Sequence, residues 1–157
     1  EIEIVASVGN GKIAIDTIVE AAPDVVVLDI EMPVMSGIEA LPHLLKRRPG
    51  LKNIIASTFS EQNAEISIKA LRAGAVDVLL KPSSQDGLEA AKEFGEALKR
   101  KVMDFGAASA VAVLPRRPHR WLANQGGHTV KSDEFSQKLS RVRFCCRVRA
   151  LGSAALS

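Results

Sequence analysis

Asp29, Ser57 and Lys81 have the types and the spacing to bind and accept a phosphoryl group. Each follows a short apolar run, which reads VVVL before Asp29, IIA before Ser57 and VLL before Lys81. A carboxylate can attack a phosphoryl group, while a hydroxyl and an ammonium can bind its oxygens as negative charge moves in. Alone, each residue has an ordinary role: a cap for Asp29, a satisfied strand-end hydroxyl for Ser57 and an exposed cation for Lys81. The combination favours a phosphorylation site.

The pattern around these residues predicts a scaffold that brings them together. Apolar, Val- and Ile-rich runs of this length are typical of strands buried on both faces of a parallel sheet. Strand-like and helix-like segments alternate as βαβαβαβα up to residue 105, which predicts an α/β fold with a doubly wound parallel sheet. The predicted strands are residues 2–8, 25–29, 53–58 and 76–80. The carboxyl ends of such strands share one edge, where open α/β sheets place their ligand sites.

Composition narrows the class of protein. With 46% apolar and 25% charged residues, the chain is typical of a globular protein, and no apolar run approaches the ~20 residues of a membrane span. Only 4% of residues are aromatic and Tyr is absent, which argues against base stacking on nucleic acid. The two cysteines, Cys145 and Cys146, are adjacent, so we expect no disulfide scaffold and a cytoplasmic location. Because the chain begins without Met, we expect it to be a fragment.

The charge divides the chain into two parts. Residues 1–105 contain 12 Lys/Arg and 16 Asp/Glu, a balance of −4, whereas residues 106–157 contain 9 and 2, a balance of +7. The second part has no hydrophobic rhythm and includes linker-like Pro and Gly stretches. We therefore predict a domain over residues 1–105 and a basic linker or tail over 106–157 that is largely disordered.

Several motifs in the first part resemble the receiver domain of two-component response regulators. They are Leu28-Asp29-Ile30-Glu31-Met32-Pro33, Gly37, Ser57, Gly74-Ala75 and Lys81-Pro82. The resemblance implies a flavodoxin-like receiver in which Asp29 accepts a phosphoryl group from a histidine kinase. It also implies that Ser57 and Lys81 contact that group, and that Asp29 and the backbone carbonyl of Glu31 ligate Mg²⁺.

Further residues are similar to those of the chemotaxis protein-glutamate methylesterases. They are Ile38-Glu39-Ala40-Leu41-Pro42, Ser57-Thr58-Phe59-Ser60 and Lys81-Pro82-Ser83. In that family a receiver controls a C-terminal esterase domain that removes methyl groups from chemoreceptor glutamates. The resemblance implies a chemotaxis histidine kinase as partner, with chemoreceptors engaged through the esterase domain, and a hydrolase as the parent protein.

The chain also departs from this family at both ends. Family receivers begin with a strand ending in an acidic pair that ligates Mg²⁺, followed by a helix, and we find neither before Glu1. We therefore expect a receiver without its first strand and helix, with a gap at the centre of the sheet and weak Mg²⁺ binding. Val148–Ser153 resembles the entry to an esterase domain, but Ala154 stands at the nucleophile position. We expect no methylesterase activity from this chain.

Two other functions remain as alternatives. The basic tail is compatible with the receiver of a different regulator, such as a DNA-binding one. A small phosphatase related to the haloacid dehalogenases would use Asp29 as nucleophile and an acid two residues later, where Glu31 stands. The Met-Pro that follows Glu31 and the lack of a separate cap segment argue against the phosphatase.

The expected gap in the sheet predicts that this chain is unstable or non-native, because two strands would lose ladder partners. Thermal melting followed by circular dichroism should show no cooperative transition for residues 1–105. A two-state transition would contradict the prediction.

Overall fold

The structure, a computed structural model, describes residues 2–58, 61–83, 85–110, 128–129 and 144–148. Strands and helices alternate over the first 110 residues, and two further strands come from the tail. The elements are β1 (Ile2–Ser7), α1 (Gly11–Ala21), β2 (Val25–Asp29), α2 (Gly37–Arg47), β3 (Lys52–Thr58), α3 (Glu61–Arg72), β4 (Asp77–Lys81), α4 (Gly87–Ala110), β5 (His128–Thr129) and β6 (Phe144–Val148). The helix α4 thus continues past residue 105, where we placed the end of the domain.

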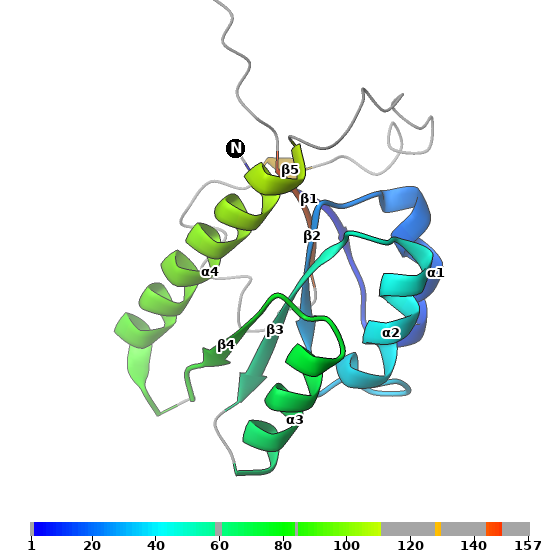
Figure 1. The fold of residues 1–157 in the computed structure, drawn as a ribbon. Coiled ribbons are helices and arrows are strands. Elements are labelled where there is room, and N and C mark those ends of the chain that lie inside the picture. The colour runs from blue at the N-terminus through cyan, green and yellow to red at the C-terminus, as the bar shows by residue number, and fades with distance from the viewer. Residues whose placement is uncertain (1, 59–60, 84, 111–127, 130–143, 149–157) are drawn as a thin grey trace, which may run out of the picture.

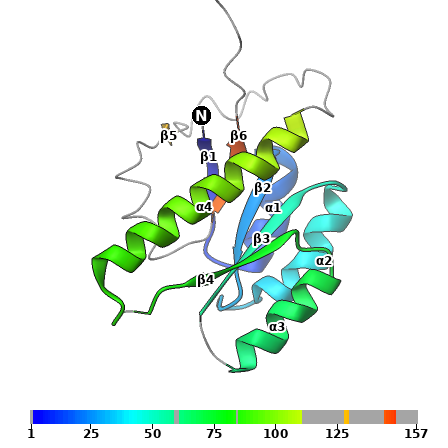
Figure 2. The same ribbon diagram turned by 60° about the vertical axis from the view of Figure 1, so that its left-hand side comes forward.

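The sheet lies between two layers of helices (Figures 1 and 2), with α1, α2 and α3 on one face and α4 on the other. Its central strand β2 is buried along its whole length, as the run of valines predicts. The prediction of an α/β fold with a parallel sheet and helices on both faces is confirmed.

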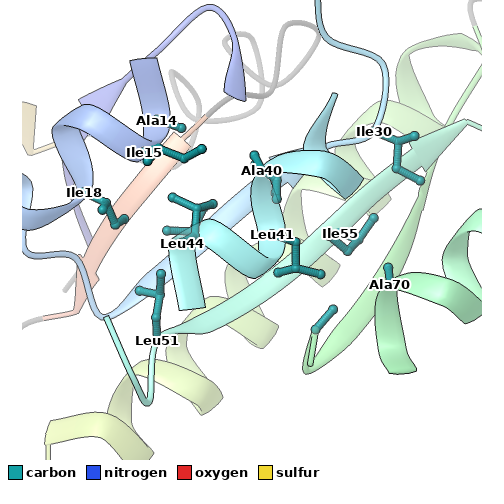
Figure 3. Close-up of a cluster of buried hydrophobic side chains, with 13 residues drawn as sticks. Ala14, Ile15, Ile18, Ile30, Ala40, Leu41, Leu44, Leu51, Ile55 and Ala70 are labelled. Carbon is teal, nitrogen blue, oxygen red and sulfur yellow. The ribbon is translucent and has the colours of Figure 1, made fainter. Parts of the chain in front are cut away.

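Alternate residues of β2 and β3 point into two hydrophobic cores, because successive strand residues face opposite sides. Val26, Leu28 and Ile55 pack with α1, α2 and α3 (Figure 3). Val25 and Val27 pack with Phe94, Leu98 and Val102 of α4. Burial of both faces fixes the register of these strands, since a slip by one residue would exchange the two cores.

Pairing within the sheet follows the order β4-β3-β2-β6-β1-β5. The pairs β2–β3 and β3–β4 are parallel. The strand β6 is antiparallel to both β1 and β2, so β1 and β2 run in the same direction with β6 between them. The parallel strands β4, β3 and β2 therefore form one half of the sheet. The other half consists of β1 together with β6 and β5, the two strands from the tail.

The central place in the sheet, where we expected a gap, is taken by β6. Cys146 is the residue opposite both Ile4 of β1 and Val25 of β2. Buried backbone N–H and C=O groups need partners, and β6 supplies them to both neighbours. Apart from β5 and β6, most of residues 106–157 lie outside the described part of the chain, so the predicted disorder of this tail stays a prediction.

We predict that Cys146→Pro destabilises the protein, because proline removes an N–H and cannot continue a central ladder. The free energy of unfolding should fall by about 2 kcal/mol or more, measured by urea unfolding with circular dichroism. Cys146→Val, which keeps the backbone donor and suits a strand, is the matched control. Equal stability of the proline variant and the native chain would show that β6 does not support the sheet.

Candidate functional site

The carboxyl ends of β2, β3 and β4 meet at one edge of the sheet. In the parallel register Asp29 lies opposite Ala56, and Thr58 lies opposite Lys81. Side chains of paired residues, and of residues two apart along a strand, share a face. Asp29, Thr58 and Lys81 therefore lie on the same face, and Ser57 belongs to the opposite one.

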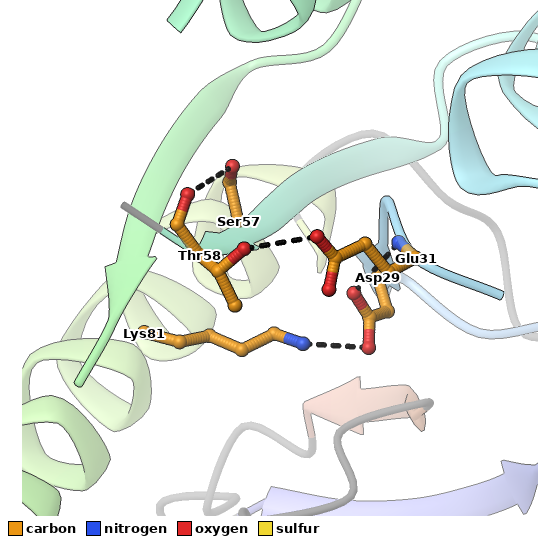
Figure 4. Close-up of polar contacts among 5 residues, drawn as sticks. All are labelled: Asp29, Glu31, Ser57, Thr58 and Lys81. Atoms are coloured by element: carbon orange, nitrogen blue, oxygen red, sulfur yellow. Dashed lines mark hydrogen bonds and ion pairs between the residues drawn. The ribbon is translucent and has the colours of Figure 1, made fainter. Parts of the chain in front are cut away.

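Asp29, which is itself buried, makes a part-buried ion pair with Lys81 across the sheet (Figure 4). The Lys81 Nζ is 2.6 Å from Oδ2 of Asp29. The Lys81 side chain is 18% exposed and the Asp29 side chain is 10% exposed. The other carboxylate oxygen, Oδ1, accepts a hydrogen bond of 3.1 Å from the backbone N–H of Glu31. Both oxygens of the candidate acceptor are thus oriented by donors. The predicted proximity of Asp29 and Lys81 is present in the structure.

The loop after Asp29 is anchored by the start of α2. Gly37 donates its N–H to the carbonyl of Ile30 at 3.3 Å, and a Cβ on Gly37 would lie 2.2 Å from the carbonyl oxygen of Asp29. No side chain fits there without moving the backbone of the acceptor. The helix approaches Asp29 this closely only because residue 37 is glycine.

A capping box fixes the same helix end. The hydroxyl of Ser36 accepts from the N–H of Glu39, and the Glu39 carboxylate accepts from the N–H of Ser36 at 2.9 Å. The Ser36 hydroxyl also donates to the Glu39 carboxylate at 2.7 Å. The bonds that the carboxylate accepts, first from the Ser36 side chain and then from its backbone, lower the pKa of Glu39. The cap satisfies N–H groups that a helix start leaves unpaired.

Ser57 is fully buried, and its hydroxyl donates to the backbone carbonyl of Thr58 at 3.2 Å. The neighbouring Thr58 points to the other face, where its hydroxyl donates to Oε1 of Glu31 at 3.1 Å (Figure 4). Sequence reasoning selected Ser57, whereas the structure places the Thr58 hydroxyl, in contact with Glu31, on the face that carries Asp29 and Lys81. The alternation of strand residues distinguishes Thr58 from Ser57 only once the pairing register with β4 is known.

Asp29 and the residues around it form a poor binding site for Mg²⁺. This ion needs near-octahedral oxygen ligands, whereas each oxygen of Asp29 already accepts from a donor, Lys81 or the Glu31 N–H. Within the described ranges, no group of three or more His, Cys, Asp or Glu side chains is close enough to hold a metal. Each oxygen keeps a second lone pair, but the Lys81 ammonium on Oδ2 would repel a second cation at the same carboxylate. The described residues alone therefore do not form a magnesium site.

Comparison with known proteins identifies the family to which this arrangement belongs. Residues 1–93 match the family described as the response regulator receiver domain. The chain belongs to this receiver family. The match covers the sheet edge with Asp29, Thr58 and Lys81, and it confirms the family that the motifs predict.

Curated relatives of this receiver are protein-glutamate methylesterases/protein-glutamine glutaminases. The group 2 operon protein of Rhodospirillum centenum is 51% identical over 109 residues, which are 69% of this chain and 28% of the relative. Protein 1 of Rhodospirillum rubrum is 42% identical over 130 residues, 83% of this chain and 33% of the relative. The receiver chain thus spans about a third or less of the length of these relatives.

Solved structures show the same fold. The response regulator domain of CheB from Thermotoga maritima is 36% identical, with a TM-score of 0.50, over 68% of this chain and 74% of that one. The receiver domain of a Luxo repressor protein from Vibrio parahaemolyticus has a TM-score of 0.52 at 22% identity, over 68% of this chain and 76% of that one.

None of the helices in the described part of this receiver has the length and apolar character needed to cross a membrane.

We predict that Lys81→Met destabilises the receiver, because it leaves the Asp29 carboxylate buried without its cation. Loss of one partner of a buried pair costs about 3 kcal/mol, measured as the free energy of unfolding in urea.

The matched control is Lys101→Met, which breaks the more exposed ion pair between α4 and Asp77 of β4. Its side chains are 33% and 29% exposed, so solvent screens this pair more, and its contribution approaches the ~1 kcal/mol or less of exposed pairs. A loss at Lys81 no larger than that at Lys101 would contradict a stabilising role for the Asp29–Lys81 pair.

Proposed function

We propose that this receiver takes part in a phosphorelay, with Asp29 as the residue that accepts a phosphoryl group from a histidine kinase. The observation that carries the proposal is the 2.6 Å contact between Asp29 and Lys81 at the carboxyl edge of the sheet, within a chain of the receiver family. An acidic nucleophile beside a fixed cation suits phosphoryl transfer, because the cation offsets negative charge as the phosphoryl group arrives.

The chemistry assigned to these residues is a displacement at phosphorus. One carboxylate oxygen of Asp29 forms a bond to phosphorus, and the bond from phosphorus to the kinase histidine nitrogen breaks. The histidine retains that electron pair. Lys81, already on Oδ2 of Asp29, would move from the carboxylate to an oxygen of the arriving group. As a point charge with rotatable donors, lysine can follow such a transfer of charge.

Ser57 is the weakest of the three residues that the motifs propose for phosphoryl contact. Its hydroxyl is buried and donates to the Thr58 carbonyl, so contact with a phosphoryl group would require that bond to break. Lys81 requires only a small movement. The proposal therefore depends on Asp29 and Lys81, with Ser57 as a second binding group after rearrangement.

The output that we propose is control of a chemotaxis methylesterase. The relatives at 51% and 42% identity carry the name protein-glutamate methylesterase, and the motifs after Asp29 and Ser57 are similar to that family. In the complete protein, a chemotaxis histidine kinase would supply the phosphoryl group in the cytoplasm. Phosphorylation would then regulate hydrolysis of methyl esters on chemoreceptor glutamates by the esterase domain.

We predict that Asp29→Asn abolishes phosphoryl uptake from acetyl phosphate, because an amide oxygen is a far weaker nucleophile than a carboxylate. Intact-mass spectrometry after incubation with the donor and Mg²⁺ should show the phosphorylated species for the native chain and none for the variant. Asp104→Asn, which changes an exposed aspartate in α4, should be labelled normally. Labelling of Asp29→Asn at the native rate would overturn the assignment.

A further inference from the structure

The loop between Asp29 and α2 contains a strained turn at Val34. Met35 donates its N–H to the carbonyl of Pro33 at 2.7 Å, and Val34 between them has a φ of 67°. A γ-turn with positive φ is the rare and strained form, and a β-branched residue is a steric outlier at such a φ. Among the described residues other than glycine, only Ala22 and Val34 have a positive φ. The turn therefore stores backbone strain next to the acceptor.

The side chain of Val34 does not hold this conformation in place. It is 83% exposed, so packing around the side chain does not account for the positive φ. Strained residues persist only where the surrounding structure determines their conformation. The contacts that hold the turn must therefore be made by the neighbours of Val34.

The start of α1 provides one of these contacts. Gly11 donates its N–H to the carbonyl of Met35 at 3.0 Å, where α1 packs against α2 (Figures 1 and 3). An N–H in the first turn of a helix has no partner within the helix, which leaves that of Gly11 available. The helix start is itself fixed, because Oδ1 of Asn10 accepts from the N–H of Ile13 at 3.0 Å.

The approach of α1 to Met35 requires glycine at position 11. A Cβ on Gly11 would lie 2.8 Å from the Cβ of Ala40, and 2.9 Å from both Cγ and the carbonyl oxygen of Met35. The Met35 side chain also packs against the core beneath α1, α2 and α3. Met35 is thus held through its backbone and its side chain, and it fixes one end of the strained turn.

The same loop carries the backbone groups that orient the acceptor. The N–H of Glu31 donates to Oδ1 of Asp29 at 3.1 Å, and the carbonyl of Ile30 accepts from the N–H of Gly37 at 3.3 Å. Only a few residues separate these groups from Met35. A displacement of Met35 would therefore move the N–H that binds Asp29.

We propose that Gly11 is a positioning residue for the acceptor, because its N–H holds the strained turn at Val34 and thereby keeps the Glu31 N–H on Asp29. Gly11 acts through Met35 and not at the reacting atoms. The consequence for phosphoryl uptake rests on the proposed function of Asp29. The strain at Val34 and its coupling to Gly11 are properties of the loop itself.

The sign of a glycine substitution at Val34 tests the strain. Hydrogen exchange of backbone amides in the full chain is followed by NMR, and stability is measured as the urea midpoint. Val34→Gly should slow exchange of the Gly11 and Met35 amides about fivefold to tenfold and raise the midpoint. Relief of the positive φ outweighs the entropy that a loop glycine loses on folding.

Two control variants separate strain from other effects of the substitution. Val34→Ala removes most of the same exposed side chain but still disfavours a positive φ, so exchange should change much less. Gln85→Gly changes an exposed loop residue that is not among those with positive φ, and it should lower the midpoint slightly. Faster exchange or a lower midpoint in Val34→Gly would overturn the inference.

The coupling between α1 and the acceptor is tested by Gly11→Ala. The added Cβ should displace Met35 and speed exchange of the Glu31 amide about tenfold, as overpacking at a close contact predicts. The effect should be smaller in the Val34→Gly background, because a relaxed residue 34 lets Met35 move without distorting the rest of the loop.

Lys12→Ala, which changes the next residue of α1 at an exposed position, is the matched control and should leave exchange of the Glu31 amide at its native rate. An unchanged Glu31 amide in Gly11→Ala, or additive effects of the substitutions at Gly11 and Val34, would show that Gly11 does not position the loop.

These measurements need no phosphoryl donor, so they distinguish this inference from the proposed function. If the chain is labelled on Asp29 while the effects of Gly11→Ala and Val34→Gly add, only the role of Gly11 is wrong. If exchange shows the coupling while the native chain takes up no phosphoryl group, the proposed function is wrong and the link between α1 and the loop stands.

Discussion

The parallel pairing of β2, β3 and β4 is the constraint on which the candidate site depends. Residues 29 and 81 are far apart in the sequence, and they meet only because the register places Asp29 opposite Ala56 and Lys81 opposite Thr58. Side chains on both faces of β2 and β3 are buried in separate cores. A slip by one residue would therefore exchange the side chains of the two cores as well as separate Asp29 from Lys81. The pairing of β2, β3 and β4 thus fixes both the hydrophobic packing and the relative positions of Asp29 and Lys81.

Much of this arrangement could be predicted from the sequence, because long periodic segments carry strong signals. The apolar run before Asp29 indicates a buried strand, and the alternation of segments predicts parallel strands whose ends share an edge. These sequence patterns could not show whether Ser57 or Thr58 places its hydroxyl near Asp29. It depends on which of two adjacent hydroxyls shares a face with Asp29, and a register is a long-range property that a single strand does not encode.

The strand β6 illustrates a second limit. Phe144–Val148 has no turn signals or neighbouring periodic segments that would mark it as part of the sheet. The strand β6 lies between β1 and β2 and pairs with both, because their buried backbone N–H and C=O groups require hydrogen-bond partners. A short segment can provide these partners with its backbone alone. Sequence patterns report side chains, so they do not predict this pairing.

The loop after Asp29 combines rigid backbone with one movable side chain. Gly37 brings α2 against the carbonyl of Asp29, and the capping box of Ser36 and Glu39 fixes the helix start. The backbone between them has little freedom, since displacement would break the cap or the close approach. The Glu31 carboxylate accepts a hydrogen bond from the Thr58 hydroxyl. A group arriving at Asp29 would therefore be accommodated first by Glu31 and Lys81, whose side chains can rotate at low cost, and only afterwards by the strands.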